Sequence, residues 1–131
     1  MTTARSAPPR TNSTILLVDD DHAVRESLCR VLAIEGWNIV TAGSGEEALE
    51  RLREHEPDLM ITDLCMMPVS GWDLLFHENI QRPRMPIFVI TALSFRATNG
   101  AAKFATEFFQ KPLDLDVLIA AVRCYLADGS S

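Results

Sequence analysis

The sequence predicts an α/β fold of five alternating strands and helices, with the strands in one parallel sheet and helices on both of its faces. Short continuous apolar runs are typical of strands buried on both faces of a parallel sheet. The segments between these runs place apolar residues at helical spacing, and right-handed crossovers carry such helices to both sides of the sheet. At 131 residues with 47% hydrophobic content, the chain has the length of one domain with its own core.

The expected strands are short and rich in β-branched and apolar residues. They cover residues 14–19, 38–42, 58–62, 86–91 and 107–110. The expected helices begin at residues whose side chains cap helix N-termini, namely Asp21, Ser44 and Asp114. The first helix ends at Gly36, and the second ends before Pro57. A third helix is expected to begin at Gly71, whereas residues 94–106 show only a weak pattern.

Composition excludes several classes of function. The net charge of −6 argues against non-specific binding of nucleic acid, which needs basic clusters. No apolar run approaches the roughly 20 residues of a membrane span. The three cysteines are odd in number and lack metal-ligand spacing, which favours reduced thiols in a cytoplasmic protein. We expect flexible tails at 1–13 and 128–131, and because the chain ends directly after the fifth helix, we expect no output domain within it.

Polar side chains follow four of the expected strands at the point where each strand ends. Asp19 and Asp20 follow the first strand, Asp63 follows the third, Thr91 ends the fourth, and Lys111 follows the fifth. Ligand sites of open parallel α/β sheets lie at the carboxyl ends of the strands. The sequence therefore predicts a shared acidic pocket at one edge of the sheet, with the composition of a metal-assisted phosphoryl acceptor.

These residues stand in the strings ILLVDDD, MITDLCMM, VITA and FFQKP. Each string alone is weak, but four in this order, at the ends of four strands, are specific. Over residues 14–127 the chain resembles the receiver domain of two-component response regulators. The resemblance implies a doubly wound, flavodoxin-like (βα)5 fold with strand order 2-1-3-4-5.

The resemblance also implies a site. Asp63 matches the phospho-acceptor, because a carboxylate can attack phosphorus and form an acyl phosphate. The implied ligands of a bound Mg²⁺ are the side chains of Asp19, Asp20 and Asp63 and the backbone carbonyl of Cys65. A cation is needed physically, because two carboxylates about 4 Å apart repel by roughly 4 kcal/mol at an effective dielectric constant near 20. Asp21 fits better as the cap of the first helix than as a third acidic ligand.

Three further residues match the conformational switch. Thr91 matches the hydroxyl that hydrogen-bonds the phosphoryl group, and Lys111 matches the lysine that pairs with the acceptor and then with the phosphoryl oxygen. Phe108 holds the place of an aromatic residue that rotates inward when Thr91 moves, although it could equally be an ordinary core residue. The Lys111–Pro112 bond matches a cis peptide of the family.

The chain departs from the family pattern in two regions. In the loop after the acceptor, the usual proline position holds Met67 and the proline is Pro68, while Cys65 stands at a place that tunes dephosphorylation. The segment from Thr91 to Lys111 is about two residues short, contains Asn99-Gly100, and has Phe104 in place of a glycine. Because glycine inside a helix costs up to about 1 kcal/mol, we expect a short or irregular fourth helix and an altered output surface.

The resulting hypothesis is a phosphorylation-dependent signalling switch, not an enzyme beyond its own phosphorylation and dephosphorylation. Its expected partners are a sensor histidine kinase or histidine phosphotransfer protein and a downstream output partner or domain, and a homodimer is left open. Two alternatives remain. A pseudo-receiver would bind partners without phosphotransfer, and a haloacid-dehalogenase-type phosphatase would use Asp19-Asp20-Asp21 as its D-x-D, although the threonine and the late acidic pair of such enzymes are missing.

Overall fold

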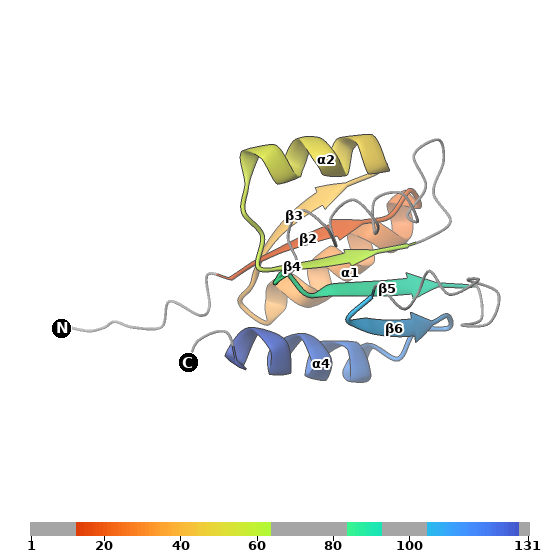
Figure 1. Cartoon of the computed structure of the whole chain (residues 1–131). Coiled ribbons are helices and arrows are strands. Elements are labelled where there is room, and N and C mark those ends of the chain that lie inside the picture. The colour runs from red at the N-terminus through yellow and green to blue at the C-terminus, as the bar shows by residue number, and fades with distance from the viewer. Residues whose placement is uncertain (1–12, 64–83, 93–104, 129–131) are drawn as a thin grey trace.

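The computed structural model describes residues 13–63, 84–92 and 105–128 (Figure 1). The described strands are β2 (Thr14–Val18), β3 (Asn38–Ala42), β4 (Leu59–Thr62), β5 (Ile87–Thr91) and β6 (Glu107–Gln110). The described helices are α1 (His22–Ile34), α2 (Gly45–Glu54) and α4 (Leu115–Asp128). Each agrees within one or two residues with an element expected from the sequence.

The five strands form one sheet in the order β3-β2-β4-β5-β6. Every neighbouring pair is parallel, with Leu16 of β2 opposite Val40 of β3 and Met60 of β4. In order along the chain this is 2-1-3-4-5, so the predicted parallel sheet and its strand order are confirmed. The order reverses at β2, which lies between β3 and β4, and such a switch point is where ligands bind in open α/β sheets.

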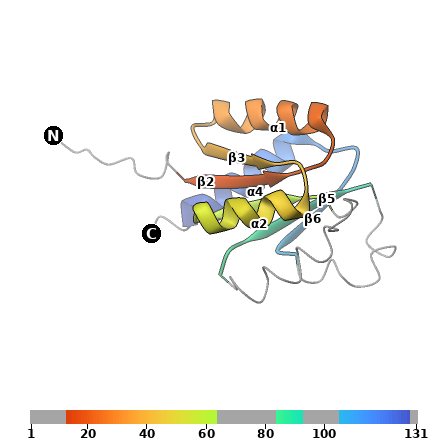
Figure 2. The same ribbon diagram turned by 90° about the horizontal axis from the view of Figure 1, so that it is seen from above.

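Helices cover both faces of the sheet (Figures 1 and 2). Successive side chains of a strand point to opposite faces. Leu16, Met60 and Val89 therefore share one face with Ala48 and Leu52 of α2. The other face packs against α1 and α4, and its largest buried side chain is Phe88. The strands are buried on both sides, which explains their continuous apolar runs.

Local chemistry sets the helix ends as the sequence predicts. Asp21 caps α1 by accepting a hydrogen bond from the backbone N–H of Val24, and Ser44 caps α2 in the same way. The carboxylate of Asp114 accepts from the backbone at the start of α4. After α1, Gly36 adopts a φ of 101°, a conformation that favours glycine and ends a helix.

Several expectations fall outside the described residues. They are the tails at 1–12 and 129–131, the helix expected to begin at Gly71, most of the weak segment 94–106, and the unusual loop that contains Cys65, Met67 and Pro68. Among the described helices, none is long and apolar enough to cross a membrane.

Candidate functional site

Backbone hydrogen bonds bring three of the predicted site residues to one edge of the sheet. Beyond the last paired residues, the N–H of Asp19 donates to Ala42 at 3.1 Å and the N–H of Asp63 donates to Val18 at 3.2 Å. At the far side, the N–H of Lys111 donates to the carbonyl of Thr91 at 2.8 Å. These bonds continue the parallel pattern just past the strands, so the side chains leave the sheet at the same end.

The side chains of these residues meet. Lys111 Nζ donates a hydrogen bond to Asp63 Oδ2 at 3.0 Å and lies 3.9 Å from Asp19 Oδ2. Both carboxylates are buried, with Asp19 3% and Asp63 7% exposed, whereas the Lys111 side chain is 30% exposed. One ammonium group therefore balances two buried carboxylates from the ends of β2 and β4. The Lys111–Pro112 peptide bond is cis, as the resemblance implies.

Burial and the close approach of these charged groups change the pKa values of Asp19 and Lys111. Burial raises the pKa of Asp19, and the negative charges of Asp63 and Asp20 add to the rise, while a hydrogen bond from Asp21 and the charge of Lys111 oppose it. Burial alone would lower the pKa of Lys111, but its hydrogen bond to Asp63 and the charges of Asp63 and Asp19 outweigh that effect and raise it. Lys111 therefore stays charged at neutral pH.

The two aspartates that follow Asp19 have different surroundings. Asp20 is exposed at the rim of the site. Asp21 faces the helix, because its side chain caps α1 while its N–H donates to Asp19 Oδ1 at 2.9 Å. The interpretation of Asp21 as a helix cap is thereby confirmed.

Thr91 and Phe108 lie on the face of the sheet that α2 covers. Thr91 is fully buried at the end of β5 and, by the alternation of side chains, points to the same face as Val89. Val89 lies opposite Phe108 in β6, and half-buried Phe108 packs against the same cluster. The two residues are thus diagonal neighbours on adjacent strands, while the switch role of Phe108 stays a prediction.

The donor set suits a hard divalent cation. Mg²⁺ prefers oxygen ligands and commonly binds through one or two carboxylates, keeping several waters. Asp19 and Asp63 supply buried carboxylates and Asp20 supplies one at the rim. The described residues contain no group of three or more His, Cys, Asp or Glu side chains arranged to hold a metal. The remaining predicted ligand, the carbonyl of Cys65, lies outside the described residues.

Sequence reasoning missed Arg25, which donates to the backbone carbonyl of Asp19 at 2.6 Å. Its position in an amphipathic helix is that of an ordinary exposed charge, and nothing local in the sequence marks the contact.

A doubly wound parallel sheet that brings two buried carboxylates and a lysine to its switch-point edge is typical of an α/β domain whose ligand site lies at the carboxyl ends of its strands. Residues 15–123 match the family described as response regulator receiver domain. The chain belongs to this family and is the receiver domain of a two-component response regulator. Response regulators interact with sensor kinases and output domains.

Known relatives of the chain are consistent with this family. The chain is 36% identical over 115 residues to the response regulator MprA of Mycobacterium leprae, covering 86% of this chain and 50% of that protein. It is 30% identical over 115 residues to the probable transcriptional regulatory protein TcrX of Mycobacterium tuberculosis, covering 86% of this chain and 49% of that one. The chain therefore spans about half the length of these curated relatives.

Solved structures share the fold. Response regulator protein TrrA from Thermotoga maritima, crystallised in complex with Mg²⁺–BeF, superposes with a TM-score of 0.80 at 32% identity, covering 86% of this chain and 98% of that one. A CheY-like receiver domain from Methanospirillum hungatei gives a TM-score of 0.84 at 24% identity over 89% and 95% of the two chains. The second likeness concerns the fold alone.

Proposed function

We propose that this chain accepts a phosphoryl group on Asp63 and thereby switches the activity of an output partner or domain. The observation that carries the proposal is the meeting of Lys111 Nζ with the buried carboxylates of Asp63, at 3.0 Å, and Asp19, at 3.9 Å. Two buried carboxylates repel each other, and titratable groups in such surroundings at a ligand-binding sheet edge are candidates for a functional site.

In the transfer from a phosphohistidine of the donor protein, an oxygen of the Asp63 carboxylate attacks phosphorus. The bond from phosphorus to the histidine nitrogen breaks, and the imidazole leaves with its electron pair and takes up a proton. Lys111 starts paired with Asp63 and follows the charge to a phosphoryl oxygen, which a flexible ammonium group is suited to do. Because Lys111 stays charged at neutral pH, its ammonium group can balance the negative charge on Asp63 before the transfer and on the phosphoryl group after it.

The proposed ligands of Mg²⁺ are the carboxylates of Asp19, Asp20 and Asp63 and the backbone carbonyl of Cys65. When bound, the cation neutralises the carboxylates and the phosphoryl oxygens, so that an anionic donor can approach. The complex of TrrA with Mg²⁺–BeF supports this assignment for a relative with the same fold.

The switch is proposed to run from Thr91 to Phe108. Phosphorylation adds about −1.5 to −2 charges, and the Thr91 hydroxyl hydrogen-bonds the new phosphoryl group. Because Thr91 and Phe108 lie diagonally on one face of neighbouring strands, movement of Thr91 opens space into which the Phe108 ring rotates. The phosphorylated and unphosphorylated states then differ in the surface shown to the partner.

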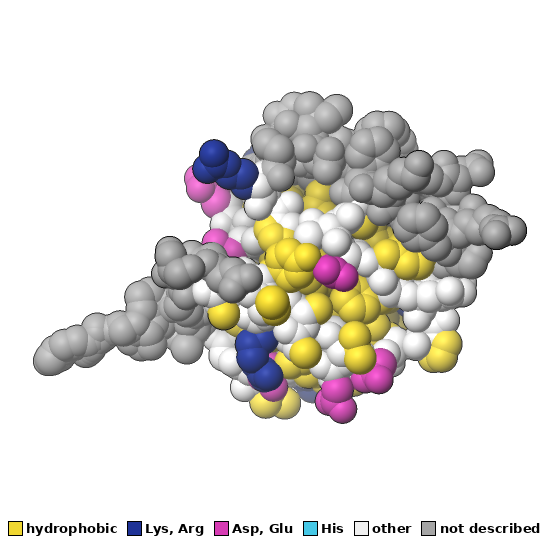
Figure 3. All heavy atoms as spheres, turned by 60° about the horizontal axis from the view of Figure 1, so that its bottom comes forward, with side chains coloured by type: hydrophobic (Ala, Val, Ile, Leu, Met, Phe, Trp, Pro, Cys, Tyr) yellow, Lys and Arg dark blue, Asp and Glu magenta, His cyan; other side chains and the backbone are white. Residues whose placement is uncertain are grey.

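The proposed donor is a sensor histidine kinase or a histidine phosphotransfer protein, and the chain itself is proposed not to turn over other substrates. The lower side of the molecule in the view of Figure 1 faces the reader in Figure 3, and it carries many hydrophobic side chains among few charged ones. Exposed Leu115 and Val117 belong to α4 on that side. This surface is suited to an output partner or a second copy of the chain. Location in the cytoplasm stays a prediction from the sequence.

Incubation with Mg²⁺ and acetyl phosphate, or with a phosphorylated kinase, tests the proposal. Intact-protein mass spectrometry should show a gain of one phosphoryl group that Asp63→Asn abolishes. Asp116→Asn, which removes an exposed carboxylate from α4, is the matched control and should be labelled like the wild type. Labelling of neither wild type nor control with either donor would leave the pseudo-receiver as the better description.

The phosphatase alternative is disfavoured because residues 15–123 match the receiver family. Steady turnover of a generic phosphate ester that depends on Asp19 would restore it.

A further inference from the structure

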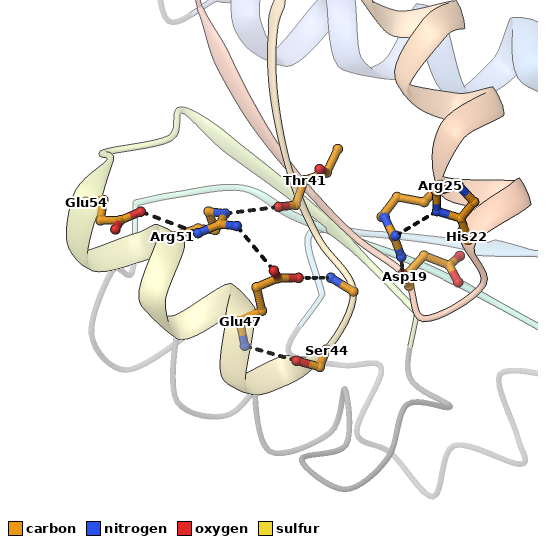
Figure 4. Close-up of polar contacts among 9 residues, drawn as sticks. Asp19, His22, Arg25, Thr41, Ser44, Glu47, Arg51 and Glu54 are labelled. Atoms are coloured by element: carbon orange, nitrogen blue, oxygen red, sulfur yellow. Dashed lines mark hydrogen bonds and ion pairs between the residues drawn. The ribbon is translucent and has the colours of Figure 1, made fainter.

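Arg25, in the first two turns of α1, binds the main chain of the acidic loop. Its Nη1 donates to the carbonyl oxygen of Asp19 at 2.6 Å, and its Nη2 lies 3.1 Å from Nδ1 of His22 (Figure 4). A guanidinium group only donates hydrogen bonds, so the His22 nitrogen accepts. The guanidinium thus binds the backbone carbonyl of Asp19 and does not occupy the Asp19 carboxylate, which can still bind a cation.

The bonded carbonyl belongs to the peptide unit that joins Asp19 to Asp20. A peptide unit is planar, so fixing its oxygen constrains the direction in which both aspartates leave the backbone. On the next residue, the N–H of Asp21 donates to Asp19 Oδ1 at 2.9 Å, and the Asp21 side chain caps α1. The backbone of the acidic pair is therefore held by two contacts from the start of α1, the Arg25 guanidinium on the carbonyl of Asp19 and the N–H of Asp21 on its carboxylate.

The space for Arg25 comes from the loop between β3 and α2. A Cβ atom built on Gly43 would lie 3.1 Å from Arg25 Nη1 and 3.5 Å from Glu47 Oε1. Contacts of 3.0–3.4 Å to a Cβ are tighter than nine in ten real ones, so a side chain at this position would shift the guanidinium by a few tenths of an ångström. The absence of a side chain at Gly43 therefore lets the guanidinium take this position without a shift.

Gly43 is itself held in place by α2. Its N–H donates to Glu47 Oε1 at 2.5 Å, and the other carboxylate oxygen of Glu47 accepts from Arg51 Nη2 at 3.2 Å. Arg51 Nε also donates to the carbonyl of Thr41 at 3.2 Å (Figure 4). Hydrogen bonds thus run from Arg51 through Glu47 to Gly43. Beside Gly43, Arg25 reaches the peptide between the two acidic residues.

We propose that Arg25 is a positioning residue for the cation site, which holds the Asp19–Asp20 peptide so that both carboxylates face the ion, with Gly43 leaving the room it needs. The inference rests on the proposed function, in which this acidic pair binds Mg²⁺. It assigns to Arg25 a role that acts through the backbone and not through contact with the ion.

Charge and positioning predict opposite effects when Arg25 is replaced. A guanidinium near a cation site repels the ion, so simple removal of its charge should tighten Mg²⁺ binding. Loss of an outer contact that orients ligands should weaken binding, typically by roughly 10-fold or more. The sign of the change therefore distinguishes the two roles.

The experiment measures Mg²⁺ affinity without any phosphoryl donor, by isothermal titration calorimetry and by amide NMR shifts. Arg25→Met should bind Mg²⁺ roughly 10-fold more weakly than the wild type. Arg25→Lys keeps the charge and can form one of the two hydrogen bonds of Arg25, so its Mg²⁺ affinity should lie between those of Arg25→Met and the wild type. Arg30→Met removes the same charge from an exposed position of α1 and should change the affinity by less than about 2-fold, because exposed charges interact weakly through water.

A double-mutant cycle with Gly43→Ala tests the spatial argument. Gly43→Ala should weaken Mg²⁺ binding in the wild type but change it little in Arg25→Met, because its effect passes through Arg25. Amide hydrogen exchange without Mg²⁺ gives a second readout. The N–H of Asp21 should exchange faster in Arg25→Met than in Arg30→Met, and if Arg25→Met does not fold, Arg25→Lys carries both measurements.

The outcomes separate the two proposals. Equal or tighter Mg²⁺ binding by folded Arg25 variants, with normal binding by the wild type, would overturn the positioning role and leave the proposed function intact. Absence of Mg²⁺ binding by the wild type would overturn both.

Discussion

Replacing Lys111 by methionine should expose the repulsion between the two buried carboxylates that it balances. Lys111 Nζ and Asp63 Oδ2 are 3.0 Å apart, and unit charges at that distance attract by about 5.5 kcal/mol at an effective dielectric constant near 20. The Lys111 side chain is 30% exposed, so water screens the pair. Exposed pairs contribute up to about 1 kcal/mol, and breaking buried ones costs about 3–5 kcal/mol. We therefore expect a coupling free energy of about 2 kcal/mol between Lys111 and Asp63.

The coupling is measured by a double-mutant cycle of Lys111→Met and Asp63→Asn, from urea denaturation in Mg²⁺-free buffer at neutral pH. Lys111→Met should lower the free energy of unfolding strongly in the wild type and much less in Asp63→Asn, because the second background has lost the charge that Lys111 pairs with. A coupling below about 0.5 kcal/mol, the usual limit of additivity, would refute the electrostatic description of the site.

Three further predictions concern stability. Burial raises the pKa of Asp19 above its usual 3.8, so this group stabilises the fold fully below 3.8 and loses that contribution as the pH rises through its folded pKa. The stability of Asp19→Asn relative to the wild type should therefore grow from pH 3.5 to pH 7 in urea denaturation, and a constant difference would contradict this. Ser44→Ala removes the cap that accepts from Glu47 N–H at 3.0 Å and should cost about 1 kcal/mol in chemical denaturation, whereas Ser44→Asp should retain most of the stability. Phe88→Ala removes a ring that is 0% exposed and should cost about 3–5 kcal/mol, while Ile34→Ala, at a position 82% exposed, should change the stability by less than about 0.5 kcal/mol; equal effects of the two would refute the packing argument.

The sequence determined the elements of this protein because their causes are local. The strands are read from apolar runs, and Asp21 and Ser44 cap the helices that follow them through hydrogen bonds to residues three positions away. The four motif strings then identified the family and, with it, the order of the strands. Their position at strand ends also predicted that Asp19, Asp63 and Lys111 would meet.

The tertiary structure alone decided how these residues meet. Lys111 pairs with Asp63, 48 positions away, more closely than with Asp19, and Asp20 stays exposed at the rim. The approach of Arg25 in α1 to Gly43, in the loop between β3 and α2, leaves no mark in either local pattern. Such contacts depend on how packing brings distant segments together, and a difference of a few tenths of an ångström there decides whether a guanidinium fits over a glycine.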